Sequence, residues 1–339
     1  MRHDIVVIGG SMGSTAVLKP ILAAMPPSLP ASVFVVVHLP TAGDGLLMRT
    51  LAKASSLPAA PAVDGEAIEP GRVYLAVPAR HLLVIDSKIE LGTGPRENMA
   101  RPAIDALFRS AALAYGPRVI GVVLSGLLDD GASGLTAIKG CGGITVVQHP
   151  RDAEAPDMPE AALAATDVDH VAPAAELGGL VTRLVGTEAD DAAVRCPPEL
   201  DLDIRIARGR RLGSERLRSF AEPVPISCPD CGGVLSEVKG EGPLRFRCQI
   251  GHGFTAEALI EAHKDNVEEA LEVAMRVMEE RFELVARLAR NAHAQGRAAV
   301  AGLYEEREKE YGTYATILRR ALTRGLRAKR GRSRDADES

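Results

Sequence analysis

Over the first 185 residues, short apolar runs alternate with longer helix-like stretches. The runs are rich in β-branched residues and lie at 5–8, 33–37, 73–77, 82–85, 119–124 and 144–147. The helix-like stretches between them include 14–25, 101–115 and 133–140. Strands that are apolar throughout are buried on both faces, which is typical of a parallel sheet covered by helices. The pattern predicts a doubly wound, mostly parallel α/β domain over residues 1–185, with a hairpin inserted at 73–91.

The rest of the chain divides into four segments. Residues 186–226 are polar and contain prolines, which predicts a linker, although the strict alternation at 200–207 indicates an edge strand. Residues 227–255 form a small module rich in cysteine and glycine. Apolar positions at three- and four-residue steps then predict a helical hairpin over 256–325, and residues 326–339 read as a basic, disordered tail. The hairpin is either simply packed on itself or an arm that binds a partner.

Composition narrows the class of protein. The 339 residues are 46% hydrophobic and 25% charged, which fits a globular chain of two domains with an extra module. No apolar run reaches the roughly 18–20 residues that span a bilayer, and the N-terminus reads as a strand instead of a signal peptide. The formal charge of -5 argues against a nucleic-acid-binding protein. The basic cluster between Arg319 and Arg334 is better explained as a helix end and solvated tail than as a nucleic-acid arm.

Polar side chains directly follow three of the predicted strands. Ser11 lies in the glycine-rich turn 9–14, His38 follows the strand at 33–37, and Asp129 and Asp130 follow the strand at 119–124. Ligands of open α/β sheets bind beyond the carboxyl ends of the strands, so these side chains are expected at one edge. Serine, histidine and a carboxylate are the nucleophile, general base and orienting group of serine hydrolases.

The residues by themselves leave alternatives open at this edge. Gly9 to Gly13 fits the G-x-S-x-G turn that exposes a nucleophilic serine, but that motif is weak when taken alone, and a plain turn would look the same. Dinucleotide binding is less favoured, because the turn lacks G-x-G-x-x-G spacing and the second strand ends in His38 instead of an acid. His149 competes with His38, and spacing does not separate Asp129 from Asp130.

Five ordered blocks of the chain resemble the catalytic domain of the chemotaxis protein-glutamate methylesterases. The blocks are GGSMGS (9–14), VVHLP (36–40), GPRENMARPAIDALFRSAA (94–112), GVVLSGLLDDGASGLTAIKGCGG (121–143) and QHPRDAEAPDMPEAAL (148–163). The resemblance covers residues 3 to about 185 and implies a doubly wound parallel sheet. It also implies a catalytic triad of Ser11, His38 and Asp130, since Asp130 occupies the family's D-G-A position. By analogy, the backbone N–H groups of Met12 and Leu127 are oxyanion candidates.

The chain departs from the family pattern in three places. Met12 replaces the threonine that usually follows the nucleophile, and Val37 replaces the glutamine that usually precedes the histidine. The usual receiver domain is not expected before the first strand, which begins at residue 5. Phosphorylation control would then need a separate receiver protein as a partner.

The cysteines suggest a metal site. The five cysteines are an odd, unevenly spaced set, which argues against a disulfide framework and for a reducing cytoplasm. Cys228, Cys231, Cys248 and His252 have the spacing C-x2-C-x16-C-x3-H, which suits a closed, tetrahedral structural zinc site. A reduced cysteine pair in a small core is the alternative. Catalysis itself needs no cofactor, and a zinc ribbon followed by a helical hairpin resembles an extension of some stand-alone methylesterases.

The sequence therefore predicts a cytoplasmic serine esterase. The resemblance implies hydrolysis of glutamate γ-methyl esters on a chemoreceptor-like signalling protein with release of methanol, and it also allows glutamine deamidation. Two alternatives remain, a non-catalytic regulator or scaffold that binds a signalling partner, and a serine hydrolase of another carboxyl ester. No membrane insertion or nucleic-acid partner is expected.

Overall fold

The computed structural model describes residues 1–38, 45–190, 196–210, 214–240 and 242–334, with side chains left undescribed at 214–216 and 324–334. It divides into two compact units, Met1–Leu259 and Ile260–Ser339. No helix among the described residues is both long enough and apolar enough to cross a membrane.

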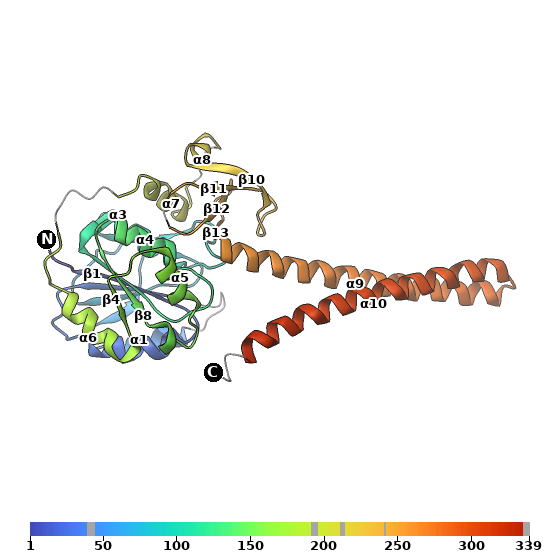
Figure 1. Ribbon diagram of the computed structural model, residues 1–339, viewed down its shortest axis with the longest axis horizontal. Helices are drawn as coiled ribbons and strands as arrows, with labels where there is room; N and C mark the ends of the chain where they lie inside the picture. The colour runs from blue at the N-terminus through green and yellow to red at the C-terminus, as the bar shows by residue number, and fades with distance from the viewer. Residues whose placement is uncertain (39–44, 191–195, 211–213, 241, 335–339) are drawn as a thin grey trace. The chain divides into compact units, whose positions relative to one another are not determined.

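A seven-stranded parallel sheet forms the centre of the first unit (Figure 1). Its strand order is β3-β4-β2-β1-β7-β8-β9, which places β1 between β2 and β7. The strands are β1 (Ile5–Gly10), β2 (Ser32–Val37), β3 (Ala59–Pro61), β4 (Arg72–Leu75), β7 (Val119–Val123), β8 (Ile144–Gln148) and β9 (His170–Ala172). The predicted doubly wound α/β fold is confirmed.

Helices cover both faces of this sheet, as Figure 1 shows. One face carries α1 (Ser14–Ala24), α2 (Leu46–Ala54) and α6 (Ala174–Leu184), and the other carries α3 (Ile104–Tyr115), α4 (Ala132–Gly140) and α5 (Asp157–Ala165). Short 3-10 helices lie at Gly116–Arg118 and Pro150–Asp152. Strand β1 explains the continuous apolar runs, because Ile5 and Val7 pack in one core and Val6 and Ile8 in the other.

The segment that the sequence predicted as an inserted hairpin, 73–91, has two parts. Strand β4 belongs to the parallel sheet, whereas β5 (His81–Ile85) and β6 (Lys88–Gly92) form the antiparallel hairpin. Asp86 and Ser87 make its two-residue turn with φ of 49° and 60°, as a tight primed turn requires.

The predicted edge strand at 200–207 is wrong. These residues form helix α7 (Glu199–Ala207), followed by α8 (Ser214–Phe220), so the segment is not simply a linker. The buried positions Leu200, Asp203, Ile204 and Ala207 have helical spacing. Alternation misled the prediction because Asp203 is a buried charge, which counted as a solvent-facing position.

The cysteine-rich module folds as a four-stranded antiparallel sheet in the order β10-β11-β12-β13. Its strands are β10 (Ala221–Ser227), β11 (Val234–Val238), β12 (Arg245–Cys248) and β13 (Gly253–Thr255). The module lies in the same compact unit as the parallel sheet. Although no disulfide framework was expected, the structure joins Cys141 to Cys196 by one disulfide, across a sequence separation of 55 residues that spacing did not reveal.

The second unit is the predicted helical hairpin. Helices α9 (Ala256–Ala294) and α10 (Ala298–Arg334) meet at a turn where Gly296 has a φ of 69°. Within the hairpin, His293 pairs with Glu305 and Arg281 stacks on Tyr311. Helix α10 extends to Arg334, past residue 326, where the disordered tail was predicted to begin. Residues 335–339 lie outside the described part.

Candidate active site

Ser11 lies in the turn between β1 and α1. Its N–H donates to the Ser125 carbonyl at 2.9 Å, and its own carbonyl accepts the Ser14 hydroxyl at 2.6 Å. Gly13 reverses the chain with a φ of 76°, a conformation that favours glycine. The neighbouring Gly126 is also required, because a Cβ there would lie 2.8 Å from the Ser11 Cβ. The turn is therefore fixed by close backbone packing, as a nucleophile elbow needs.

His38 lies beside Ser11 because of the sheet register. Gly10 and Val37 are partners at the ends of β1 and β2, and Ser11 and His38 are the residues that follow them. The His38 N–H donates to the Gly10 carbonyl at 3.3 Å. Two residues 27 positions apart thus meet at the carboxyl edge of the sheet.

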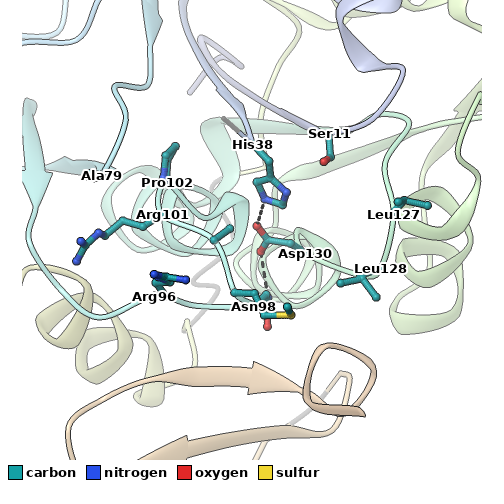
Figure 2. A pocket seen from close by; sticks show the side chains of 12 residues that line it. Ser11, His38, Ala79, Arg96, Asn98, Arg101, Pro102, Leu127, Leu128 and Asp130 are labelled. Carbon is teal, nitrogen blue, oxygen red and sulfur yellow. Dashed lines mark hydrogen bonds and ion pairs between the residues drawn. The ribbon is translucent and has the colours of Figure 1, made fainter. Parts of the chain in front are cut away.

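Asp130 completes a row of three side chains. It follows β7, the other neighbour of β1, and its Oδ2 lies 2.7 Å from His38 Nε2. In Figure 2 the imidazole ring stands between Ser11 and Asp130. Because Nε2 contacts the carboxylate, the remaining ring nitrogen, Nδ1, is the atom that can accept the Ser11 proton.

The Asp130 carboxylate is buried at the first turn of α3. It accepts the Ile104 N–H at 2.7 Å, the Asp105 N–H at 3.1 Å and the Asn98 side-chain amide at 3.1 Å. Burial alone would raise the pKa of Asp130, but the His38 hydrogen bond and charge, together with these N–H donors, lower it below its usual value. The carboxylate is therefore ionised at neutral pH and can stabilise an imidazolium.

A second buried carboxyl, Asp105, lies next to Asp130. It accepts the Gly131 and Gly134 N–H groups at the start of α4. Burial and the Asp130 charge raise the pKa of Asp105 to about 8. The pair consequently carries close to one negative charge at neutral pH, located on Asp130.

The structure separates the candidates that spacing left open. Asp129 accepts the Thr255 hydroxyl at 2.7 Å, and burial raises the pKa of Asp129 to about 6. His149 Nδ1 accepts the Arg151 N–H at 3.1 Å and so caps a local turn. His38 and Asp130 are the two that contact each other.

Ser11, His38 and Asp130 share one cavity of about 380 Å³ (Figure 2). The other lining residues are Ala79, Arg96, Asn98, Met99, Ala100, Arg101, Pro102, Leu127 and Leu128. Of the two oxyanion candidates, Leu127 lines the cavity and Met12 does not. Neither N–H donates a hydrogen bond to any described residue.

Sequence reasoning missed the residues that support this cavity. Arg96, Glu97 and Asn98 lie in the block 94–112 that resembles the methylesterases, but the sequence predicts no role for them. Asn98 is a buried non-glycine residue with a φ of 50°. The available signal was the polar pair Glu97 and Asn98 before the helix-like stretch 101–115. No local pattern shows that Asn98 contacts Asp130.

A buried ionic network joins α3, α7 and the cysteine-rich module. Asp203 Oδ2 lies 2.7 Å from Arg245, and Asp203 Oδ1 lies 2.8 Å from Arg247. Glu97 pairs with Arg109 and, at 3.1 Å, with Arg247. Although burial alone would raise the pKa of Asp203, Arg247, Arg245 and Arg109 lower it far below its usual value.

Replacing Asp203 with alanine should lower the free energy of unfolding by about 3–5 kcal/mol, because the buried Arg109 and Arg247 and the partly buried Arg245 lose a shared counter-charge. Urea unfolding followed by circular dichroism measures this. A carboxyl with a lowered pKa stabilises the fold above its ordinary pKa near 4, so the contribution is lost as pH falls below that value. The matched control is Asp201→Ala on the same helix, which should cost about 0–1 kcal/mol because its pair with Arg205 is exposed. Equal losses in both variants would contradict the prediction.

The four predicted metal ligands come together in the module. Their ligand atoms lie within 4.8 Å of one another. The Cys231 and Cys248 sulfurs are 3.8 Å apart, and His252 Nδ1 is 3.7 Å from the Cys228 sulfur and 3.6 Å from the Cys248 sulfur. A tetrahedral site with zinc–sulfur bonds of about 2.3 Å and zinc–nitrogen bonds of about 2.0 Å has edges of about 3.5–3.8 Å. These three distances match the edges of a tetrahedral site, so the Cys3His cluster could hold a metal ion.

Two tight turns present these ligands. The Gly232 N–H donates to the Cys228 carbonyl at 2.8 Å, and the Gly251 N–H donates to the Cys248 carbonyl at 3.0 Å. Gly232 and Gly251 have φ values of 71° and 107°. The cluster can hold a metal ion with four protein ligands.

Comparison with known proteins identifies the family of the chain. The family model of the CheB methylesterases matches residues 6–181. A relative from Leptospira interrogans, whose name assigns it to the protein-glutamate methylesterases/protein-glutamine glutaminases, is 38% identical over 54% of this chain and 96% of its own length. A protein-glutamate methylesterase/protein-glutamine glutaminase of Anaeromyxobacter dehalogenans is also 38% identical, over 54% of this chain and 52% of its own.

A solved structure shares the fold of the N-terminal part of the chain. The crystal structure of the Thermotoga maritima CheB methylesterase catalytic domain superposes with a TM-score of 0.52 at 31% identity. It covers 55% of this chain and 100% of that domain. Residues 6–181, which the family model matches, include Ser11, His38 and Asp130. The chain belongs to the CheB methylesterase family.

Proposed function

We propose that this protein is a serine esterase that hydrolyses glutamate γ-methyl esters on the cytoplasmic helical region of a chemoreceptor. The observation that carries the proposal is the 2.7 Å pair between His38 and Asp130 in the cavity that also contains Ser11. The family supports the ester class, and the names of relatives support glutamate as the modified residue.

In the proposed mechanism, His38 Nδ1 takes the proton of the Ser11 hydroxyl, and Ser11 Oγ attacks the ester carbonyl carbon. The negative oxygen of the tetrahedral intermediate accepts a hydrogen bond from the backbone N–H group of Leu127, the oxyanion candidate that lines the cavity. The intermediate then expels methanol, which receives the proton from His38. Water, deprotonated by His38, attacks the acyl-enzyme and releases the glutamate and Ser11. Asp130 keeps the imidazole oriented and stabilises its charge.

The same steps would deamidate glutamine, with ammonia leaving in place of methanol. The relatives' names include glutaminase activity, which favours this as a second reaction. Both reactions pass through one tetrahedral intermediate on Ser11, so one site serves both.

The Cys3His cluster is proposed to hold zinc as a structural ion. Cys228, Cys231, Cys248 and His252 would fill all four positions of a tetrahedral ion, which leaves none open for substrate. Its contribution would be to join the two ligand turns, and the ester chemistry needs only the side chains of the cavity.

The test is to incubate the protein with a methylated receptor fragment and to measure methanol together with the mass of the fragment. We expect one methanol for each methyl group lost, and no methanol from an unmethylated fragment. Hydrolysis of simple carboxyl esters without action on the receptor would favour the hydrolase of another ester. Absence of both reactions would favour the scaffold.

Arg96 should contribute to recognition of an acidic substrate. Its exposed side chain lines the cavity together with Arg101, on the side away from Ser11 (Figure 2). Arg96→Glu should raise KM for the receptor about tenfold, corresponding to about 1.4 kcal/mol, with kcat nearly unchanged, and the effect should shrink at high salt. Arg2→Glu, the same charge change at the amino end of the sheet, is the control. An unchanged KM, or an equal rise in the control, would contradict this role.

A further inference from the structure

The second turn of the Cys3His cluster continues directly into the loop that lines the active site. One residue after the ligand His252, the Gly253 carbonyl accepts the Asn98 N–H at 2.9 Å, and the Gly253 N–H donates to the Arg96 carbonyl at 3.3 Å. Strand β13 thereby pairs with residues 96–98 as well as with β12. The metal-binding turn and the cavity wall are part of one backbone hydrogen-bonded structure.

Asn98 connects this structure to the triad carboxylate. Its Oδ1 accepts the Thr255 N–H at 2.9 Å, and its Nδ2 donates at 3.1 Å to both Asp130 Oδ1 and Asp105 Oδ2. An amide has one accepting and one donating end. Only with Oδ1 toward Thr255 does Asn98 satisfy a backbone N–H on one side and the carboxyl oxygens of Asp130 and Asp105 on the other. The left-handed backbone of Asn98 is held in place by these partners.

A second contact runs in parallel. The Thr255 hydroxyl donates to Asp129 Oδ1 at 2.7 Å, next to Asp130 in the chain. Thr255 is 1% exposed, so water does not compete for these hydrogen bonds. The last strand of the module therefore contacts both the loop 96–98 and the segment that carries the catalytic carboxylate.

Two backbone hydrogen bonds close the ligand turn, residues 248–252, from the Cys248 N–H to the His252 carbonyl and from the Gly251 N–H to the Cys248 carbonyl. The Arg247 guanidinium also holds the ligand turn, because it donates to the Gly251 carbonyl at 2.9 Å. A metal ion would add a link from Cys248 and His252 to Cys228 and Cys231. Such a link would further restrain the start of β13 and, through it, the position of Asn98.

We propose that metal binding at the Cys3His cluster controls the esterase by positioning Asn98 against Asp130 through β13. Asn98 is a positioning residue, because it acts on His38 only through the carboxylate. The inference rests on the proposed function of the triad, but it concerns the reactivity of Ser11 and is measurable without a protein substrate.

The experiment follows phosphonylation of Ser11 by a p-nitrophenyl phosphonate, in which the serine oxygen bonds to phosphorus and p-nitrophenolate leaves. Zinc content by mass spectrometry and the phosphonylation rate are measured for the full chain, His252→Ala, Asn98→Ala and the double variant. His252→Ala should lose its zinc, and its rate should fall about 10- to 100-fold, as should that of Asn98→Ala. The double variant should be no more than about twofold slower than Asn98→Ala, since both changes break the same link.

The matched control is His293→Ala, the same substitution on the exposed hairpin, which should keep both zinc and rate. If His252→Ala does not fold by circular dichroism, Cys231→Ser and chelation of the wild-type protein supply the zinc-free state. A zinc-free protein that reacts at the wild-type rate would overturn the proposal. So would an undiminished effect of zinc loss in the Asn98→Ala background, or a wild-type chain that binds no zinc. Rapid phosphonylation with no action on methylated receptor would instead refute the proposed substrate and leave the coupling intact.

Discussion

Replacing Ser11 with alanine should reduce methanol release from a methylated receptor fragment by about 10⁴- to 10⁶-fold. The variant keeps the turn, because the Ser11 backbone bonds to Ser125 and Ser14 do not involve its hydroxyl. What it loses is the oxygen that forms the acyl-enzyme, and none of the other described residues that line the cavity carries a hydroxyl or thiol. Gas chromatography of methanol and the intact mass after phosphonate treatment measure the two consequences, since the variant should also fail to gain the phosphonate.

Ser14→Ala is the control for this prediction. Ser14 lies in the same turn, and its hydroxyl donates to the Ser11 carbonyl, so its loss should cost about 1 kcal/mol of stability and less than about tenfold in rate. Methanol release that persists in Ser11→Ala at more than about a hundredth of the wild-type rate would exclude Ser11 as the nucleophile.

Replacing Asp130 with asparagine should lower kcat by about 10³- to 10⁴-fold. The amide is nearly isosteric, but it no longer carries the charge that stabilises the His38 imidazolium. It also places an N–H₂ group where the carboxylate accepts the Ile104 N–H and contacts His38 Nε2. The imidazole would therefore lose its preferred tautomer, which is the one whose unprotonated Nδ1 faces Ser11. Binding of the receptor should change little. Measuring KM together with kcat therefore distinguishes a slower catalytic step from weaker binding of the substrate.

Asp129→Asn is the control, because it removes a neighbouring buried carboxylate and leaves Asp130 unchanged. It tests whether the loss of activity is specific to the carboxylate at position 130. Asparagine keeps an oxygen that can accept the Thr255 hydroxyl, and Asp129 makes no contact with His38. We expect less than about tenfold loss in kcat. If the two variants lost activity equally, the assignment of the orienting carboxylate to Asp130 would be wrong.

The two largest effects depend on different kinds of support. Ser11 needs a turn of fixed shape, which Gly13 and Gly126 provide by their conformation and lack of a side chain. Asp130 needs hydrogen-bond donors from the first turn of α3 and from Asn98, which is itself hydrogen-bonded to Thr255 of the metal-binding module. The proposed metal control therefore acts on the orienting carboxylate of the triad, while the nucleophile is left in place.

The sequence by itself determined the α/β class, the burial of the strands on both faces of the sheet, and the polar residues that follow the strands. These follow from short-range rules: strands buried on both faces are apolar throughout, and residues after parallel strands lie at one edge of the sheet. The sequence placed Ser11 and His38 at this edge but left His149 as an alternative to His38, which the pairing of β1 with β2 in the structure resolves. The ligand spacing of the Cys3His cluster was equally local, since each ligand pair lies within one turn.

Only the tertiary structure decided which groups complete the site. Residues 200–207 alternate like a strand, yet they form helix α7, because Asp203 pairs with arginines about 40 positions further along the chain. Asn98 reaches Asp130, 32 positions away, and Thr255, 157 positions away. The disulfide between Cys141 and Cys196 joins equally separate segments. A buried charge or amide is stable only where its partners converge, and those partners come from segments whose proximity no local pattern specifies.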